Sequence, residues 1–492
     1  MALFIGIDLG TSACKFLLAN DGGEVLNIVS KSYAVEFPHP GWSQQDPEDW
    51  WQAVREGIPE LLQGFDASQV AGIGCGGQMH GLVALNANDR VIRPAILWND
   101  GRTEAQVRYL NEEIGTDKLL EWTGNIAFAG FTAPKILWMR DEEPELFGRI
   151  AHVMLPKDFI NLRLTGVYAT DASDAAGMLL LDTSGRCWSP EMLDICGITE
   201  DMLPRVHESY EPIGRVRDEV ADELGIPRGV VVAAGAGDNA AAAVGCGVVG
   251  AGSCNISLGT SGTVFIPTDS FAAGLGDQIH SFCHADGAWH LMGCILSAAS
   301  CNMWWQEGIL GTSDYAAEQA DIDAADASPD KPYFLPYLMG ERTPHNDTSA
   351  RGAFVGMNMA TTRADMTRAV LEGVAFAIRD SVEIARSLGV DLRQSMVCGG
   401  GSRSRLWMEM LASICNLTLT MPTTEQGPGY GGAILAMVAA GTYPNVDEAC
   451  HALVTVRDTV SPDPALVAAY DARYQVWRGM YPALKGSFRQ MQ

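Results

Sequence analysis

Short runs of apolar residues alternate along the chain with longer stretches in which apolar positions recur at the helical period. The short runs predict strands, which cover residues 70–73, 91–97, 230–234 and 395–398. The longer stretches predict helices, each beginning near an Asp, Ser or Thr that can cap it, and these cover residues 46–62, 102–114, 363–387 and 404–415. Short strands that alternate with helices predict an α/β fold, with layered sheets covered by helices on both faces.

One short pattern occurs twice in the chain. Residues 4–18 (FIGIDLGTSACKFLL) and residues 254–266 (CNISLGTSGTVFI) each consist of an apolar run, the tetrapeptide L-G-T-S and a second apolar run. This order predicts a strand, a tight turn and a returning strand. Because the copies lie about half a chain apart, they indicate two similar domains. We predict an N-terminal domain of residues 1–246 and a C-terminal domain of residues 247–492.

The first of these turns carries groups suited to a nucleotide phosphate. Gly10 lets the backbone come close to a ligand, and the N–H groups of Gly10 to Ser12 can point into one concavity. Thr11 and Ser12 add hydroxyls, and Asp8 supplies the hard oxygen that Mg²⁺ takes, usually through its water shell. The alternative is that this segment is only a hairpin turn.

Two further turns extend this pattern. The second L-G-T-S copy, with Gly259 and Thr260, repeats the turn without an acid. A C-G-G-G-S-R-S turn contains Gly400 and Gly401 and ends at Ser404, between a predicted strand and a predicted helix whose N-terminus favours anions. There is no P-loop motif, and the two G-x-G-x-x-G matches lack the strand–helix context of a dinucleotide site. Together the turns predict a Mg-nucleotide held between two domains.

A lone carboxylate is the best candidate for proton transfer. The predicted strand at residues 230–234 is followed by a glycine turn and then by Asp238 and Asn239, which open an alanine-rich helix. Ligands of α/β proteins bind at the carboxyl ends of strands, so Asp238 can serve as a general base toward a hydroxyl. The alternative is that Asp238 only caps the helix.

Composition and charge narrow the function classes. The formal net charge is −27 and no Lys- or Arg-rich run exists, which argues against a nucleic-acid or anionic-membrane partner. No stretch approaches the ~20 apolar residues that span a bilayer, and the N-terminus lacks a basic signal region. The twelve cysteines are scattered without a C-x-x-C motif, as is typical of buried thiols in a cytosolic protein. We expect a cytoplasmic protein.

Three polar or aromatic clusters have ordinary structural explanations. Trp42, Trp50 and Trp51 are expected in the core rather than stacked on a sugar. His280, His284 and His290 lack the spacing of a metal site, so no structural metal is expected. The charged segment at residues 341–345 (ERTPH) is expected to be a solvated loop.

Several segments resemble the FGGY carbohydrate kinases. Residues 130–142 (GFTAPKILWMRDE) match the first pattern of that family, and residues 352–372 match the second. Within the family, the segments G-Q-M-H-G, W-N-D-G-R and E-R-T-P-H look like those of the xylulokinases; they lie at residues 77–81, 98–102 and 341–345. The resemblance implies two actin-like, ribonuclease-H-like domains around a central cleft, and ATP-dependent phosphorylation of the small ketose D-xylulose to D-xylulose 5-phosphate.

The resemblance also implies individual roles. Asp238 would accept the proton of the C5 hydroxyl, while Met79, His80 and Asn239 contact the sugar. Asp8 would organise Mg²⁺, through water, near the phosphates of ATP. The predicted nucleotide contacts come from the three turns: Gly10, Thr11, Ser12, Gly259, Thr260, Gly400, Gly401 and Ser404.

Other functions stay open at this point. The chain could phosphorylate another ketose or a polyol, such as ribulose, or it could be a catalytically inactive regulator that binds sugar or nucleotide on the same scaffold. Asp8, Asp238 and both L-G-T-S turns argue against the regulator, because a binding protein has no use for a base. Whether the chain forms a homodimer is left open by the sequence.

Overall fold

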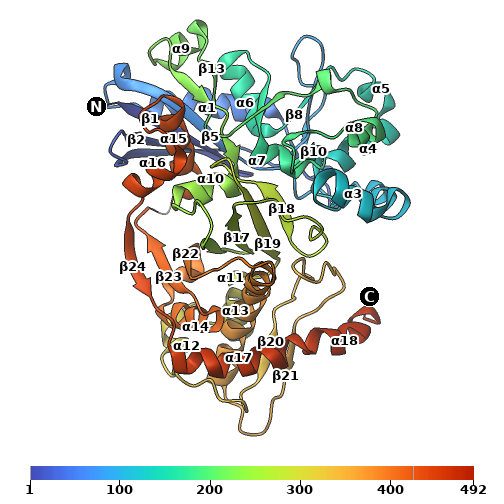
Figure 1. The fold of residues 1–492 in the computed structure, drawn as a ribbon, viewed down its shortest axis with the longest axis vertical. Helices are drawn as coiled ribbons and strands as arrows, with labels where there is room; N and C mark the ends of the chain where they lie inside the picture. The colour runs from blue at the N-terminus through green and yellow to red at the C-terminus, as the bar shows by residue number, and fades with distance from the viewer. Residues whose placement is uncertain (1, 425, 492) are drawn as a thin grey trace.

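The computed structural model describes residues 2–424 and 426–491, which form two lobes stacked along the long axis of the molecule (Figure 1). The first lobe is built on a mixed sheet that begins with the N-terminal hairpin. Its strands lie in the order β13 (Pro212–Arg215), β14 (Val231–Ala233), β5 (Val70–Gly77), β1 (Leu3–Leu9), β2 (Ala13–Asn20) and β3 (Val25–Ser32), with β15 (Ala236–Gly237) paired to β5.

The second lobe repeats this plan. Its strands lie in the order β18 (His280–Cys283), β19 (Trp289–Ile295), β17 (Gly262–Thr268), β16 (Ser253–Leu258), β22 (Gln394–Cys398), β23 (Thr418–Pro422) and β24 (Val456–Val460). In each sheet an antiparallel hairpin, β1–β2 or β16–β17, is extended by a strand parallel to its first member, β5 or β22. The two hairpins are the two L-G-T-S copies, so the predicted repeat and the expected actin-like, ribonuclease-H-like fold are confirmed.

The predicted helices form, with one change. Helix α1 (Pro47–Leu61) is capped by Asp46, α13 spans Arg363–Ser387, and α14 (Arg405–Cys415) is capped by the Ser404 side chain. The helix predicted at residues 102–114 instead forms a short α2 (Glu104–Arg108) that continues as a π-helical segment (Tyr109–Gly115).

Most of the predicted strands form as well. Residues 70–73, 230–234 and 395–398 fall on β5, β14 and β22. The strand predicted at residues 91–97 shrinks to β7 (Ala95–Ile96), because Pro94 has no N–H for a ladder and the Arg93 guanidinium turns aside to Glu143.

The core predictions for the tryptophans and cysteines also stand. Trp50 and Trp51 on α1 are 0% and 5% exposed and pack in the first lobe, and Trp42 lies beneath the Arg102 guanidinium. All twelve cysteines are free thiols, of which only Cys187 is exposed. Among the described residues, no helix combines the length and apolarity that a membrane crossing needs.

A helix from late in the sequence returns to the first lobe. Helix α15 (Gly427–Ala439) packs against β1, β5 and α10 (Asp238–Gly245), and α16 (Val446–Leu453) lies beside it (Figure 1). Glycines face each other across these contacts: a Cβ on Gly74 of β5 would lie 2.1 Å from the carbonyl oxygen of Gly432. The predicted domain boundary falls in the loop between α10 and β16, and α15 crosses back over it.

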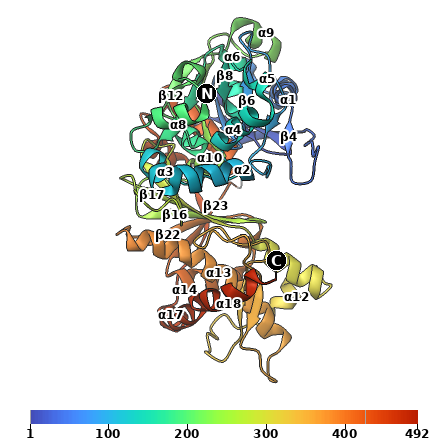
Figure 2. The same cartoon turned by 90° about the vertical axis from the view of Figure 1, so that its right-hand side faces the viewer.

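Several side chains join the lobes on the opposite side, among them that of Asn125. The Asn125 amide nitrogen donates to the Ser281 carbonyl oxygen at 2.8 Å, and the Ser281 N–H donates to Asn125 Oδ1 at 3.2 Å. Asn125 thus pairs with β18 as a neighbouring strand would. In the side view of Figure 2, β16 and β17 lie where the two lobes meet.

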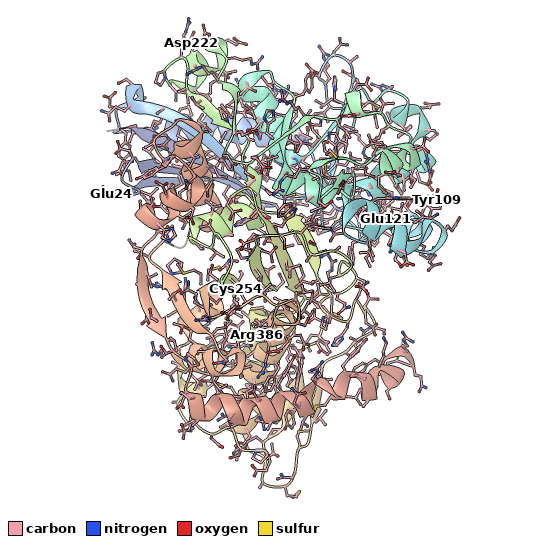
Figure 3. All side chains as sticks on the ribbon, in the orientation of Figure 1. Glu24, Tyr109, Glu121, Asp222, Cys254 and Arg386 are labelled. Carbon is pink, nitrogen blue, oxygen red and sulfur yellow. The ribbon has the colours of Figure 1, made fainter. Side chains whose placement is uncertain are left out.

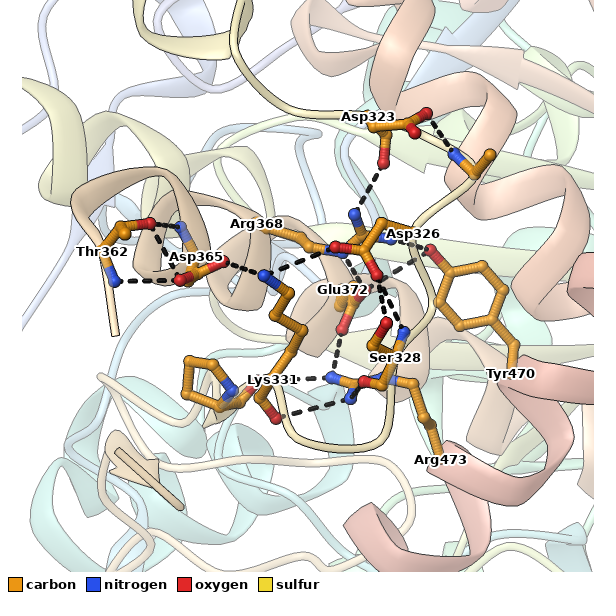
Figure 4. Close-up of polar contacts among 12 residues, drawn as sticks. Asp323, Asp326, Ser328, Lys331, Thr362, Asp365, Arg368, Glu372, Tyr470 and Arg473 are labelled. Carbon is orange, nitrogen blue, oxygen red and sulfur yellow. Dashed lines mark hydrogen bonds and ion pairs between the residues drawn. The ribbon is translucent and has the colours of Figure 1, made fainter. Parts of the chain in front are cut away.

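A buried ionic network fixes the outer helix of the second lobe (Figure 4). Glu372 of α13 accepts from Arg368 Nε at 2.7 Å and from Arg473 Nη2 at 2.6 Å, and the Tyr470 hydroxyl lies beside both groups. Arg473 and Tyr470 belong to α17 (Pro464–Arg478), so the network ties that helix to α13. Removing one partner of such a buried pair leaves an uncompensated charge, which is costly.

Replacing Gly431 with Ala should destabilise the protein by about 1–3 kcal/mol, because overpacking of a tight contact costs that much. The added Cβ would lie 1.8 Å from the Ala241 carbonyl oxygen of α10. This outcome opposes the ~1 kcal/mol by which alanine normally favours a helix over glycine. The free energy of unfolding, measured in urea, tests the expectation.

Gly429→Ala in the same helix is the matched control, because its Cβ would meet nothing closer than Leu17 Cβ at 3.6 Å. We expect this variant to be as stable as the parent or more so. Equal stability of the two variants would contradict the packing argument.

Candidate active site

Two adjoining cavities open where the lobes meet. The first, of about 620 Å³, takes its walls from both halves of the chain, and the second, of about 930 Å³, lies within the second lobe. Four of the predicted sugar-site residues line the first cavity: Met79, His80, Asp238 and Asn239. Gly400, Gly401 and Ser404 line the second, and Gly259 and Thr260 line both. Asp8, Gly10, Thr11 and Ser12 line neither.

Asp238 is the first residue of α10, directly after β15. The N-cap of this helix is Gly237 and no side chain caps it, so the alternative that Asp238 is only a cap is wrong. The Asn239 amide nitrogen donates to Asp238 Oδ1 at 3.0 Å and fixes the carboxylate at the cavity wall. Burial, together with the nearby Asp8 carboxylate, raises the pKa of Asp238 to about 7, although the hydrogen bonds from Asn239 act to lower it. A carboxyl that titrates near neutrality is suited to general-base catalysis.

His80 faces the same cavity as a neutral imidazole. Its Nδ1 lies 2.7 Å from the Gly177 carbonyl oxygen, and because a carbonyl only accepts, Nδ1 carries the proton. Burial lowers the pKa of His80 to about 3, with the Lys135 charge adding to the effect. The second ring nitrogen therefore keeps its lone pair and can accept a hydrogen bond from a hydroxyl.

Met79 supplies an apolar wall between these two polar residues. Its side chain is 5% exposed, and its sulfur lies 4.0 Å from the Asn239 amide nitrogen. A Cβ on Gly237 would come within 3.0 Å of that sulfur, so the glycine before Asp238 leaves room for Met79.

Arg342 is a cavity residue that the sequence analysis placed in a solvated loop. Its guanidinium lies 4.6 Å from the centre of the Phe128 ring, across the boundary between the lobes. The expected solvated loop is wrong, because Glu341 is 2% exposed and accepts the N–H groups of Leu296 and Arg342 at 2.9 and 2.8 Å. Burial raises the pKa of Glu341 to about 8.

The sequence signal for Arg342 was the E-R-T-P-H segment, which the family resemblance had already marked. His280 also lines the first cavity and stacks on Phe282. Nothing in its local sequence distinguishes it from a core histidine, because strand pairing alone brings β18 to the cleft.

The two L-G-T-S turns differ in which of their backbone N–H groups are free to bind a ligand. The Gly10 N–H donates to the Ala13 carbonyl oxygen at 3.1 Å, so the predicted use of all three N–H groups from Gly10 to Ser12 is wrong. Thr11 instead reaches the first cavity indirectly, since its hydroxyl accepts from Trp98 Nε1 at 2.9 Å. In the second turn, the N–H groups of residues 259–261 donate to none of the described residues and remain available to an anion.

The glycine turn at residues 399–401 opens onto the second cavity. Gly399 has a φ of 88°, which favours glycine, and a Cβ on Gly400 would meet nothing within 4 Å. Ser404 caps α14 and donates its hydroxyl to Gln319 Oε1 at 2.6 Å. The apolar side chain of Met303 and the ring of Tyr315 lie on the same cavity, which suits a planar base.

A divalent cation would need ligands beyond the protein. Among residues 2–424 and 426–491, no group of three or more His, Cys, Asp or Glu side chains could hold a metal ion. Burial raises the pKa of Asp8, whose carboxylate acts electrostatically on Asp238. A single acid fits a cation that arrives with a nucleotide and keeps most of its water.

Both halves of the chain are similar to known carbohydrate kinases. The model of the N-terminal domain of the FGGY family of carbohydrate kinases matches residues 3–245, and that of the C-terminal domain matches residues 254–440. The xylulose kinase of Escherichia coli (strain K12) is 42% identical over 484 residues, covering 98% of this chain and 99% of that protein. The xylulose kinase of Bacillus subtilis (strain 168) is 36% identical over 488 residues, covering 99% and 98%.

A solved structure gives the same relation in three dimensions. The crystal structure of a xyloylose kinase from Brucella ovis superposes with a TM-score of 0.93 at 41% sequence identity, covering 98% of this chain and 99% of that one.

Asp238 should titrate near pH 7, and Asp8→Asn should lower its pKa, because the substitution removes a negative charge that opposes ionisation of Asp238. Carbon-13 NMR of labelled aspartate carboxyls measures both values. Asp222→Asn on α9 (Asp218–Leu224), at the outer end of the first lobe (Figure 3), is the control and should leave the titration unchanged. An Asp238 pKa that did not move in Asp8→Asn would contradict the electrostatic assignment.

Proposed function

The chain belongs to the FGGY family of carbohydrate kinases, and from this we propose that it transfers the terminal phosphate of ATP to the C5 hydroxyl of D-xylulose. The relatives named xylulose kinase support this choice of sugar, since their similarity to this chain runs through both halves. The observation that carries the proposal is the Asp238 carboxylate, which lines the interdomain cavity and has a pKa of about 7.

Asp238 acts as the general base in this proposal. Its ionised carboxylate accepts the proton of the C5 hydroxyl as the oxygen attacks the terminal phosphorus, and the bond between that phosphorus and ADP breaks. Asn239 holds the carboxylate in place through its 3.0 Å hydrogen bond. Positioning and electrostatic stabilisation supply most of the catalysis in phosphoryl transfer, so a fixed base is the main chemical contribution of the protein.

Four side chains recognise the sugar in this proposal. The unprotonated ring nitrogen of His80 accepts a hydrogen bond from a hydroxyl, and Asn239 offers its amide group. Met79 packs against the carbon chain of the sugar. Arg342 donates to sugar oxygens from the opposite lobe, and its planar guanidinium is held by the Phe128 ring.

The second cavity holds the nucleotide in this proposal. The open backbone at Gly400 and the free N–H groups of residues 259–261 bind the phosphates, while Met303 and Tyr315 flank the base. Mg²⁺ neutralises phosphate charge when it is bound, and Asp8 holds it through water. Since Gly259 and Thr260 line both cavities, the phosphate to be transferred belongs at this turn.

The two halves of the chain correspond only in part to the two binding sites. We propose that residues 1–246 carry the base and most of the sugar site, and that residues 247–492 carry the ATP site. Arg342 and His280 complete the sugar cavity from the second half. A cytoplasmic location, where ATP is present and thiols stay reduced, agrees with the free cysteines.

Replacing Asp238 with Asn should lower kcat by roughly 10²–10⁴, the usual worth of a general base. ATP affinity should stay nearly intact, because Asp238 lines only the sugar cavity. A coupled ADP-release assay gives kcat, and calorimetry with ADP gives the nucleotide affinity. If Asp238→Asn kept full activity, Asp238 would not be the general base.

A panel of ketoses and polyols should give the highest kcat/KM with D-xylulose. Ribulose, the C3 epimer of xylulose, and glycerol, which has only three carbons, should be poorer acceptors, because each presents its hydroxyls to the cavity in a different arrangement. A higher kcat/KM with another sugar would change the proposed substrate but not the proposed kinase activity. Sugar binding without ADP release from any acceptor would instead indicate an inactive regulator.

A further inference from the structure

Residues 130–142, which match the first family pattern, contribute few side chains to the sugar cavity or to the nucleotide cavity. It forms the end of a cavity wall and then helix α4 (Thr132–Glu142), which is buried over most of its length. Gly130 and Phe131 line the first cavity, while the chemistry-bearing residue of the segment, Lys135, points away from solvent and is 0% exposed. Lys135 has no role in the proposed phosphoryl transfer or among the proposed contacts to the sugar.

Lys135 joins two pieces of the sugar-cavity wall. Its ammonium donates to the carbonyl oxygen of His80 at 2.7 Å and to that of Gly130 at 2.6 Å. The Thr132 hydroxyl donates to the same His80 carbonyl at 3.1 Å. One end of α4 thereby holds both the Met79–His80 turn and the segment 129–131, which lie side by side in the cavity wall.

The backbone of His80 requires such a hold. Its φ of 69° lies in the left-handed region, which is uncommon for residues other than glycine and costs energy unless the surroundings enforce it. Two donors on its carbonyl oxygen and one acceptor on its ring Nδ1 fix the peptide and the imidazole together. The orientation of the free ring nitrogen toward the cavity follows from these three bonds.

Stability does not account for Lys135. Among the described residues, no carboxylate lies within ion-pair distance of its ammonium, and burial lowers the pKa of this lysine well below its ordinary value. The acid that acts on it most, Asp100, is already held by Arg102 through bonds of 2.8 and 2.9 Å. Burying an ammonium without a counter-ion costs free energy, and this cost offsets the stabilisation that its two hydrogen bonds to backbone carbonyls provide.

We propose that Lys135 is a positioning residue for sugar recognition: it fixes His80 and Gly130 in the geometry that the substrate requires, at a cost to the stability of the fold. The inference rests on the proposed function, because it takes D-xylulose as the ligand of the first cavity.

The test is Lys135→Met, which keeps the length and removes both hydrogen bonds. D-xylulose should bind about 10- to 100-fold more weakly, since a misplacement of about 1 Å costs up to about 10²-fold. ADP affinity should not change, and the Tm should stay the same or rise. Calorimetry with D-xylulose and, separately, with ADP gives the affinities, and thermal unfolding gives the Tm.

Lys157→Met is the matched control for a buried lysine. Lys157 is equally buried but pairs with Asp158 at 2.7 Å and Asp171 at 2.8 Å, with Asp174 at 3.9 Å. Its replacement leaves three buried carboxylates and should lower the Tm clearly. Opposite effects of the two substitutions on the Tm separate a positioning lysine from a structural one.

A double-mutant cycle with His80→Ala gives the sharper readout. If Lys135 acts through His80, Lys135→Met should weaken sugar binding much less in the His80→Ala background than in the parent. Parental affinity for D-xylulose in Lys135→Met, additive effects in the cycle, or a loss of ADP binding together with a lower Tm would each overturn the inference.

Failure of the proposed function is distinguishable from failure of this inference. In the first case the parent chain itself would not bind D-xylulose. The same cycle, run with whichever acceptor the panel shows the parent to use, would then decide the role of Lys135.

Discussion

Contact between backbones, without side chains between them, is the constraint on which the site depends. Helix α15 lies so close to β1, β5 and α10 that a Cβ on Gly6, Gly74 or Gly431 would overlap a facing carbonyl group. This contact sets the position of α10 against the first sheet and therefore the position of its first residue, Asp238. The Asp238 carboxylate is thus placed by a helix that contributes no residue to the first cavity, and glycine is chosen for the space it leaves rather than for turn geometry.

The site combines groups whose protonation is set by burial. Burial raises the pKa of Asp238 to about 7 and keeps His80 neutral, and Arg342 lines the same cavity from the second lobe. Each group is supported by a neighbour with no role in the chemistry: Asn239, Gly177 and Phe128. The two family patterns belong to this supporting layer, since Lys135 holds the cavity wall and Glu372 ties α17 to α13. Neither Lys135 nor Glu372 lines either of the two cavities.

Local patterns predicted much of this arrangement. The repeated hairpins, α13 and the strand–turn–helix at Asp238 follow from apolar periodicity and capping, which act between residues close in sequence. The features that were not predicted depend on contacts between residues far apart in the sequence. Arg342 and His280 reach the cavity because a turn and an edge strand of the second lobe meet the first. The family resemblance marked the segment of Arg342, whereas nothing in the local sequence marked His280. The Gly10 N–H is consumed by its own hairpin, a detail that depends on the turn geometry and not on composition.

The late position of α15 in the sequence also affects how the protein is made. A ribosome releases all strands of the first sheet by residue 237, but the helix that covers one face of that sheet ends only at residue 439. Until then, the apolar residues that α15 covers, among them Phe4 and Leu17, remain open to other chains. The N-terminal lobe therefore completes its core only near the end of synthesis, after most of its partner lobe has emerged.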